Sequence, residues 1–139
     1  NTGLRELPPA NKSLIWYSYD ESKELPWVGV GGKNTMAGPI NYSDQFSDAK
    51  RFPDYFDGKL LIYEWMRNWI YVVKMDSTGQ MLRVDPFMAN ESFSRPMDMV
   101  FGPDGALYVL EYGQMWFSAN LDARLNKIEF VRGNRVLRF

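Results

Sequence analysis

The segment PDGALYVLEY, residues 103–112, has an earlier counterpart in FDGKLLIYEW, residues 56–65. The later copy follows the earlier one by 47 positions, from Asp57 to Asp104, and four of the ten aligned residues are identical. Self-similarity at a fixed spacing is the sequence signature of a repeat architecture, so it constrains the fold before any other pattern does. We therefore interpret the chain as two copies of one structural unit.

The similarity continues beyond these two segments. NWIYVVKM, residues 68–75, corresponds to ARLNKIEF, residues 123–130, with an offset of 55 from Ile70 to Leu125. The two offsets differ by 55 minus 47, so the second unit carries an insertion of 8 residues, which we place in the loop GQMWFSANLD, residues 113–122. Each unit ends with one more β-like run, beginning at Gln80 and at Asn134.

Aromatic and β-branched residues predict strands along most of the chain, and no window has the 3.6-residue period of a helix. We expect a leading strand at Leu14–Tyr19 and a tight loop, not a phosphate-binding turn, in the glycine-rich segment Gly29–Pro39. The polar segment 43–58 suits a connection with one short helical turn. Residues 76–80 and 132–134 are predicted to be hairpin turns.

Four short antiparallel strands per unit, repeated roughly every 40 to 50 residues, are typical of β-propeller blades. We therefore predict an all-β fold, a partial β-propeller with about two four-stranded antiparallel blades plus a leading strand of another. Residues 1–35 would form the leading strand and glycine-rich loop, and residues 36–88 and 89–139 one blade each, within one domain. Since closed propellers have about 4 to 8 blades, we expect a fragment of a larger propeller.

Composition excludes several classes of function. A formal charge of −1 gives no electrostatic reason to expect nucleic acid as a partner, and no apolar run approaches the length of a membrane span, so we expect no membrane insertion. The chain has no cysteine and no histidine, which removes thiolate chemistry and the commonest general base and metal ligand. Any acid/base chemistry must therefore use carboxylates, lysine, tyrosine or a residue outside this chain, and we assign no catalytic residue and no metal ligand within it.

A family resemblance rests on four segments in order: residues 31–42 (GGKNTMAGPINY), 52–76 (FPDYFDGKLLIYEWMRNWIYVVKMD), 95–113 (RPMDMVFGPDGALYVLEYG) and 122–135 (DARLNKIEFVRGNR). Together they resemble the C-terminal blades of the glucose/sorbosone dehydrogenase family. That resemblance implies a six-bladed propeller that oxidises sugars with pyrroloquinoline quinone (PQQ) and calcium. It also implies a periplasmic or extracellular setting.

The resemblance also implies which residues would contact the quinone. Where the family has a cofactor-binding lysine this chain has Met66, followed by Arg67, and the family's R-x-R-D pattern is Arg95-Pro96-Met97-Asp98 here. Arg95 and Arg67 are therefore the expected cofactor-binding residues, although Met66 and Met97 cannot donate hydrogen bonds to the cofactor's carboxylates. The family's histidine base and calcium ligands lie in earlier blades. We thus expect the isolated chain to be inactive and to hold neither PQQ nor calcium tightly.

Trp116, in the long inserted loop, is the expected substrate-binding residue because loops carry function more often than strands do. Trp65, Trp69 and Tyr112 could also stack on a sugar ring, or they could pack between blades. Two further questions stay open at this point. Glu64 and Glu111 could make repeated structural hydrogen bonds or act as acids, and Arg95 could pair with Asp98 or face a pocket.

Two functional hypotheses follow. The first is that the chain is the C-terminal part of a glucose/sorbosone dehydrogenase-like propeller whose parent oxidises sugars with a quinone. The alternative is a non-catalytic propeller module that binds carbohydrate or protein. In either case the expected partners are a sugar and the missing blades of the parent, or a second copy that forms a homodimer.

Overall fold

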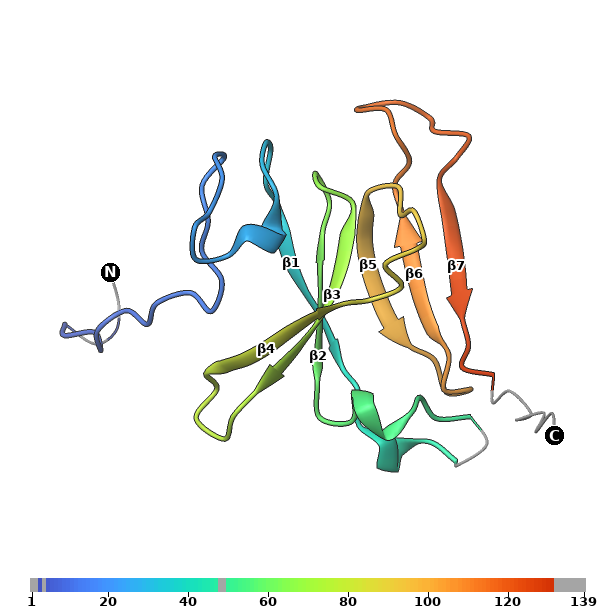
Figure 1. Cartoon of the computed structure of the whole chain (residues 1–139), viewed down its shortest axis with the longest axis horizontal. Coiled ribbons are helices and arrows are strands. Elements are labelled where there is room, and N and C mark those ends of the chain that lie inside the picture. The colour runs from blue at the N-terminus through green and yellow to red at the C-terminus, as the bar shows by residue number, and fades with distance from the viewer. Residues whose placement is uncertain (1–2, 4, 48–49, 132–139) are drawn as a thin grey trace, which may run out of the picture.

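The computed structural model describes residue 3, residues 5–47 and residues 50–131, which form two antiparallel sheets (Figure 1). The first sheet has the strand order β1-β2-β3-β4. Its strands are β1 (Thr35–Ile40), β2 (Leu60–Glu64), β3 (Trp69–Met75) and β4 (Met81–Pro86). The predicted all-β class and the four antiparallel strands of the first unit are confirmed.

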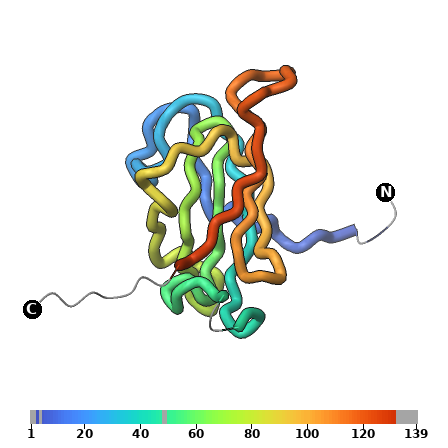
Figure 2. The backbone as a smooth tube through the Cα atoms, turned by 90° about the vertical axis from the view of Figure 1, so that its right-hand side faces the viewer, coloured from blue at the N-terminus to red at the C-terminus, as the bar shows by residue number. Residues whose placement is uncertain are grey.

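The second sheet has the order β5-β6-β7. Its strands are β5 (Pro96–Phe101), β6 (Leu107–Glu111) and β7 (Arg124–Ile128). The predicted hairpin turn at residues 132–134 and the fourth strand from Asn134 lie outside the described residues. Between β6 and β7, the inserted loop rises beyond both sheets (Figure 2).

Strand register repeats between the two sheets as the sequence offsets predict. Leu60 pairs with Val73 across β2 and β3, and Leu107 pairs with Ile128 across β6 and β7. The partners in the second pair lie 47 and 55 positions after those in the first, which are the two offsets of the repeat. The internal similarity therefore reflects an equivalent three-dimensional unit.

The connections are short 3₁₀ turns, namely η1 (Pro26–Val28), η2 (Ser43–Gln45) and η3 (Asp54–Phe56). Segment 43–58 thus contains two such turns where one was expected. The hairpin turn at residues 76–80 is confirmed, because Asp76 N–H donates to the Gln80 carbonyl at 2.9 Å and Gly79 has a φ of 82°. Only glycine adopts that backbone conformation without strain.

Two local predictions were wrong. Leu14–Tyr19 is not a strand: the carbonyls of Tyr17 and Ser18 accept hydrogen bonds from the side chains of Lys33 and Arg67 and not from a neighbouring strand. The glycine-rich segment is a loop only up to residue 34, since β1 begins at Thr35.

Gly38 lies in β1, at a point where the second sheet approaches the strand closely. A Cβ atom at this position would lie 2.7 Å from the Met99 sulfur of β5 and 3.0 Å from the Leu61 carbonyl oxygen. The glycine therefore permits contact between the two sheets. Its role is not to turn the chain.

The sheets pack with unlike faces in contact. Four buried residues of β2 and β3 face the second sheet: Leu61, Tyr63, Ile70 and Val72. The second sheet meets them with Leu107 and Val109 of β6. In the repeat these two correspond to Leu60 and Ile62, which lie on the opposite face of the first sheet because side chains alternate along a strand. The sheets therefore stack front to back, a heterologous arrangement that a two-fold axis does not generate.

This stacking leaves the two outer faces in different states. The outer face of the first sheet is covered by the leading segment, where Trp27 packs against Trp69 and Tyr71 with ring centroids 5.6 and 4.8 Å apart. On the outer face of the second sheet Val100, Leu110 and Leu125 are exposed. The described residues thus provide a cover for one end of the stack only.

Candidate functional site

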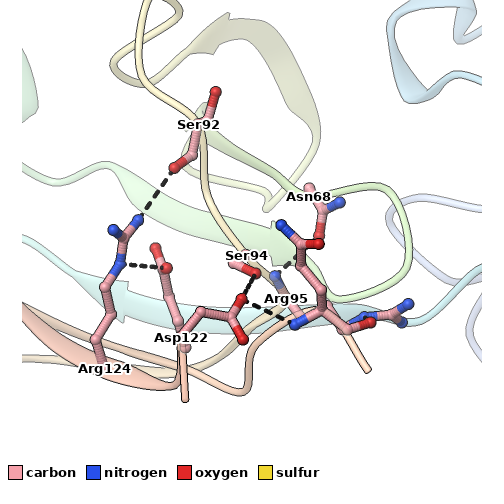
Figure 3. Close-up of polar contacts among 8 residues, drawn as sticks. Asn68, Ser92, Ser94, Arg95, Asp122 and Arg124 are labelled. Carbon is pink, nitrogen blue, oxygen red and sulfur yellow. Dashed lines mark hydrogen bonds and ion pairs between the residues drawn. The ribbon is translucent and has the colours of Figure 1, made fainter. Parts of the chain in front are cut away.

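Arg95 lies at the junction of the two sheets, immediately before β5. Its backbone has a φ of 55°, and its N–H donates to Asn68 Oδ1 in the β2–β3 turn at 2.9 Å (Figure 3). Its side-chain Nε donates to the carbonyl of Gln114 in the long loop at 3.0 Å. Arg95 therefore connects the first sheet, the second sheet and the loop.

Two indole rings contact the guanidinium of Arg95, and a third aromatic side chain packs against one of them. Its central carbon lies 4.6 Å from the ring centroid of Trp65 and 5.6 Å from that of Trp116. Trp65 meets Trp116 and Tyr112 edge to face, with centroids 4.6 and 5.5 Å apart. We refer to Arg95, Trp65, Tyr112 and Trp116 as the Arg95 platform.

The platform presents an accessible aromatic surface beside unused donors. Trp116 is 51% exposed. Arg95 Nη1 has a single weak contact to the sulfur of Met66 at 3.7 Å, and Nη2 has no acceptor in the described part of the chain. A half-exposed indole next to a guanidinium edge can stack on an apolar ring face and donate hydrogen bonds to oxygens at its rim.

The loop that carries Trp116 is held by Asn120 and Asp122. The side-chain amide nitrogen of Asn120 donates to the carbonyls of Tyr112 and Met115 at 3.0 and 2.9 Å. Asp122 Oδ2 accepts from Ser94 Oγ and from Gln114 N–H, both at 3.1 Å (Figure 3). These bonds fix both ends of the loop, so the position of Trp116 is built into the fold.

Arg67 serves a different purpose. Its five N–H groups all donate to backbone carbonyls of the leading segment, at distances of 2.7 to 3.0 Å. The acceptors are Ser18, Val28, Gly29, Gly31 and Gly32. The guanidinium also lies 4.5 Å from the ring centroid of Tyr17. Since a guanidinium has five donors, none is left over for a cofactor in this arrangement.

The two methionines at the family's cofactor positions add no polar group. Met66 packs against Gly32, where a Cβ atom would lie 2.5 Å from its terminal methyl carbon. Met97 is 40% exposed on β5. The quinone carries several carboxylates, and of the residues assigned to it only Arg95 has donors without partners. Arg95 alone is therefore left to contact the quinone from this chain.

Glu64 makes structural hydrogen bonds. The carboxylate accepts from the backbone N–H groups of Asn34 and Arg67 and from the hydroxyl of Tyr17. Burial, ahead of the neighbouring Glu64 charge, raises the pKa of Tyr17, so this hydroxyl stays a donor. The side chain of Glu64 is buried and turned toward the leading segment, where it joins that segment to the first sheet.

Two further expectations are resolved by geometry. The pairing of Arg95 with Asp98 is wrong, because Asp98 Oδ1 accepts from the N–H of Met99 at 2.8 Å while Arg95 turns toward Trp65. Trp69 is not part of the platform, since its indole N–H donates to the Val28 carbonyl at 3.1 Å. Arg95 and Trp116, assigned separately to cofactor and substrate, come together in one cluster.

Sequence reasoning missed the residues that position the platform. Asn68, with a φ of 58°, was not singled out, although Asn is the residue type that tolerates this conformation in a turn. Asn120 and Asp122 sit in the inserted loop, where polar residues are expected in any case. Nothing in their spacing indicated the partners that the tertiary fold brings to them.

Comparison of the chain with protein-family models, with curated proteins and with solved structures finds no match. Within residues 3, 5–47 and 50–131, no three His, Cys, Asp or Glu side chains come together in a way that could hold a metal ion. No helix in the described part of the chain has the length and apolar character needed to cross a membrane. The fold itself defines an all-β protein built from two antiparallel sheets stacked front to back.

Proposed function

We propose that this protein binds carbohydrate at the Arg95 platform. The observation that supports this proposal is the guanidinium of Arg95 beside two indole rings that contact each other, with Nη2 unused and Trp116 half exposed. A pyranose has an apolar face of C–H groups and a rim of hydroxyls, and it matches a surface that combines an aromatic ring with fixed donors.

In this proposal the sugar ring stacks on Trp116 and a hydroxyl oxygen accepts from Arg95 Nη2. The cation–π contacts with Trp65 and Trp116 hold the guanidinium in place before the ligand arrives, which lowers the ordering cost of binding. One stacked ring and one charge-assisted hydrogen bond correspond to weak affinity, with a Kd on the order of 1 mM.

The setting we propose is a propeller-like ring in an exported protein. The front-to-back stack supports it, because each sheet offers the next one a different face, and the exposed Val100, Leu110 and Leu125 form the face that a following sheet would cover. Further blades are a better match for this face than a two-fold homodimer, which would bring two identical faces together.

Sugar oxidation by a larger propeller is the second candidate function. It rests on Arg95, which keeps the position that the family resemblance assigns to a quinone contact. The test is dye reduction by the longest native form of the protein with PQQ, calcium and a panel of aldoses. Turnover would support oxidation, while sugar binding without turnover would favour the binding module.

The binding proposal is tested by titrating the protein with mono- and oligosaccharides while tryptophan fluorescence and NMR shifts are recorded. We expect Trp116→Ala and Arg95→Gln to weaken binding by about 10-fold each, as expected for removing about 1.4 kcal/mol of interaction. Trp16→Ala is the matched control, because Trp16 is 73% exposed and its ring contact in the described part of the chain is with Lys33, outside the platform. Absence of saturable binding across the panel, or an unchanged Kd in Trp116→Ala, would refute the proposal.

A variant in the loop that carries Trp116 distinguishes sugar binding from binding of a protein partner. Phe117 and Leu121 are highly exposed, at 93% and 104%. The ring of Phe117 contacts that of Trp116, with centroids 5.6 Å apart, whereas Leu121 makes no side-chain contact of this kind with Trp116 in the described part of the chain. Leu121→Ser should therefore leave sugar binding unchanged. If the wild-type protein binds no sugar but binds another protein, and Leu121→Ser weakens that protein binding, the loop is a protein contact instead.

A further inference from the structure

Arg95 carries a positive charge that no carboxylate of the described residues neutralises. The side chain is half-buried and takes part in no ion pair in that part of the chain. Other arginines have such partners: ion pairs join Arg51 to Asp54, Arg83 to Asp85 and Arg124 to Glu111, and Arg67 donates to five carbonyls. The charge of Arg95 is therefore left for a ligand to neutralise.

The free donors of Arg95 lie at the end of its guanidinium. Nε is used, because it donates to the Gln114 carbonyl at 3.0 Å. Nη1 contacts only the sulfur of Met66, a weak acceptor, at 3.7 Å. Nη2 has no acceptor in the described part of the chain and is open to solvent, unlike the unpaired atoms that the fold shuts off from water. The two Nη atoms match the two oxygens of a carboxylate, which accepts two parallel N–H groups and also neutralises the charge.

The carboxylates in the segments around the platform are held by other groups. Asp122 Oδ2 accepts from a hydroxyl and a backbone N–H, both at 3.1 Å (Figure 3). Asp98 Oδ1 accepts from a backbone N–H at 2.8 Å, and the buried Glu111 pairs with Arg124 at 2.8 Å. None of the three forms an ion pair with Arg95, so a ligand carboxylate meets no competitor there. Because their negative charges offset long-range attraction, recognition of such a ligand depends on direct contact with Arg95.

We propose that the ligand favoured by the Arg95 platform is an acidic pyranose, whose carboxylate accepts from Arg95 Nη1 and Nη2 while its ring stacks on Trp116. This inference rests on the carbohydrate binding proposed above and adds the class of sugar. Trp65 supports it, because its ring lies 4.6 Å from the guanidinium and partly excludes water from it. A charge-assisted hydrogen bond is stronger where water is partly excluded.

The test compares methyl glycosides with the corresponding methyl glycosiduronates, in the gluco and galacto series, by tryptophan fluorescence and NMR titration. The members of each pair differ only in a hydroxymethyl group or a carboxylate at one carbon, so both can stack on Trp116 in the same way. We expect the uronate to bind about 10-fold more tightly in at least one series, since charge-assisted hydrogen bonds are roughly twice as strong as neutral ones. Acetate, a carboxylate without a ring, should bind more weakly than the uronate.

Variants separate the charge of the platform from its aromatic surface. Arg95→Gln should abolish the preference, so that both members of a pair bind with equal affinity. Arg95→Lys keeps the charge but loses the paired donors, so its preference should be intermediate. Trp116→Ala should weaken both members about equally and leave the ratio of their affinities unchanged. Trp16→Ala, which lies outside the platform, should alter neither affinity.

Saturable binding of both members with equal affinity in each series would overturn this inference and leave carbohydrate binding at the platform intact. Absence of saturable binding by every glycoside and uronate would refute both proposals. A preference that persists in Arg95→Gln, or acetate that binds as tightly as the uronate, would also overturn this inference, because the carboxylate or the ring would then be recognised elsewhere or not at all. If Arg95→Gln does not fold, an unchanged affinity ratio in Arg95→Lys has the same consequence.

Discussion

Glu64 and Glu111 occupy the same position in two successive sheets, and both are buried, but their carboxylates are held in different ways. Glu64 accepts from Asn34, Arg67 and Tyr17, whereas Glu111 accepts from Arg124 alone. The strand partner at this position is Trp69 in the first sheet and Arg124 in the second. A conserved place in the repeat has therefore acquired two local environments.

This difference predicts unequal costs for the same substitution. Glu64→Leu would leave the backbone N–H groups of Asn34 and Arg67 without an acceptor, while the Tyr17 hydroxyl would keep its hydrogen bond with Thr35. At about 1–3 kcal/mol for each N–H group, we expect a loss of at least about 2 kcal/mol in the free energy of unfolding. Glu111→Leu removes an oxygen that has no partner and frees an exposed Arg124, so we expect a change of less than about 1 kcal/mol. Urea unfolding of both variants measures the difference, and equal losses would contradict it.

Arg67 is predicted to hold the leading segment on the first sheet. Arg67→Ala removes five hydrogen bonds, and we expect about 3 kcal/mol of lost stability, because bonds to a charged group contribute about 1.5–3 kcal/mol each and do not add fully. Limited proteolysis should then cut within residues 18–34. Arg67→Lys keeps the charge but reaches fewer carbonyls, so its loss should be intermediate. If cleavage is the same in wild type and Arg67→Ala, the leading segment is held by other contacts.

The contact between Gly38 and Met99 predicts a coupled pair. Gly38→Ala places a methyl group 2.7 Å from the Met99 sulfur, and such overpacking costs about 1–3 kcal/mol. Met99→Ala leaves a cavity and costs about 2–5 kcal/mol by itself. In the double variant the added methyl group partly fills that cavity. The loss of stability in the double variant should therefore be smaller than the sum of the losses in the two single variants. Additive losses in a double-mutant cycle would show that the sheets separate at another point.

Asp104 predicts a pH dependence of stability. The ion pair with Lys127 at 2.9 Å, the Tyr108 hydroxyl and the Ala106 N–H lower the pKa of Asp104 to about 2. Because the folded state holds this proton less tightly than the unfolded chain, whose pKa is about 3.9, the stabilisation is present above about pH 4 and is lost as the pH falls through about 2.

Asp104→Asn should therefore be less stable than wild type at pH 7, and the gap should close between pH 4 and pH 2. Urea midpoints across this range measure it. Asp54→Asn is the control, because the Asp54 side chain is 84% exposed and pairs only at the surface with Arg51. A gap that stays constant down to pH 2 would show that the Asp104 charge does not contribute.

Much of the fold could be predicted from local pattern. The offsets of 47 and 55 residues predicted that the pairing of β2 with β3 recurs between β6 and β7, because a duplicated unit keeps its register when each strand keeps one buried face. The hairpin turn with Gly79 was also predictable, since a positive φ selects glycine. These features depend on neighbours within the same unit.

Predictions failed where a residue's partner comes from a distant segment. Leu14–Tyr19 has the composition of a strand, yet side chains of Lys33 and Arg67 take the carbonyls that a neighbouring strand would need. Arg67 and Arg95 were both expected to bind the cofactor, but distant segments give them different environments. Arg67 is enclosed by the leading segment, while Arg95 faces Trp65 and Trp116.

The sequence by itself determined the all-β class, the repeated unit and the strand register, because alternation and turn chemistry act over a few residues. Only the tertiary structure decided that the sheets stack front to back, that Arg95 and Trp116 share one platform, and that Glu111 lacks the donors of Glu64. Those outcomes depend on which groups from separate segments reach the same donors and acceptors, and hydrogen-bond competition of this kind has no local signature in the chain.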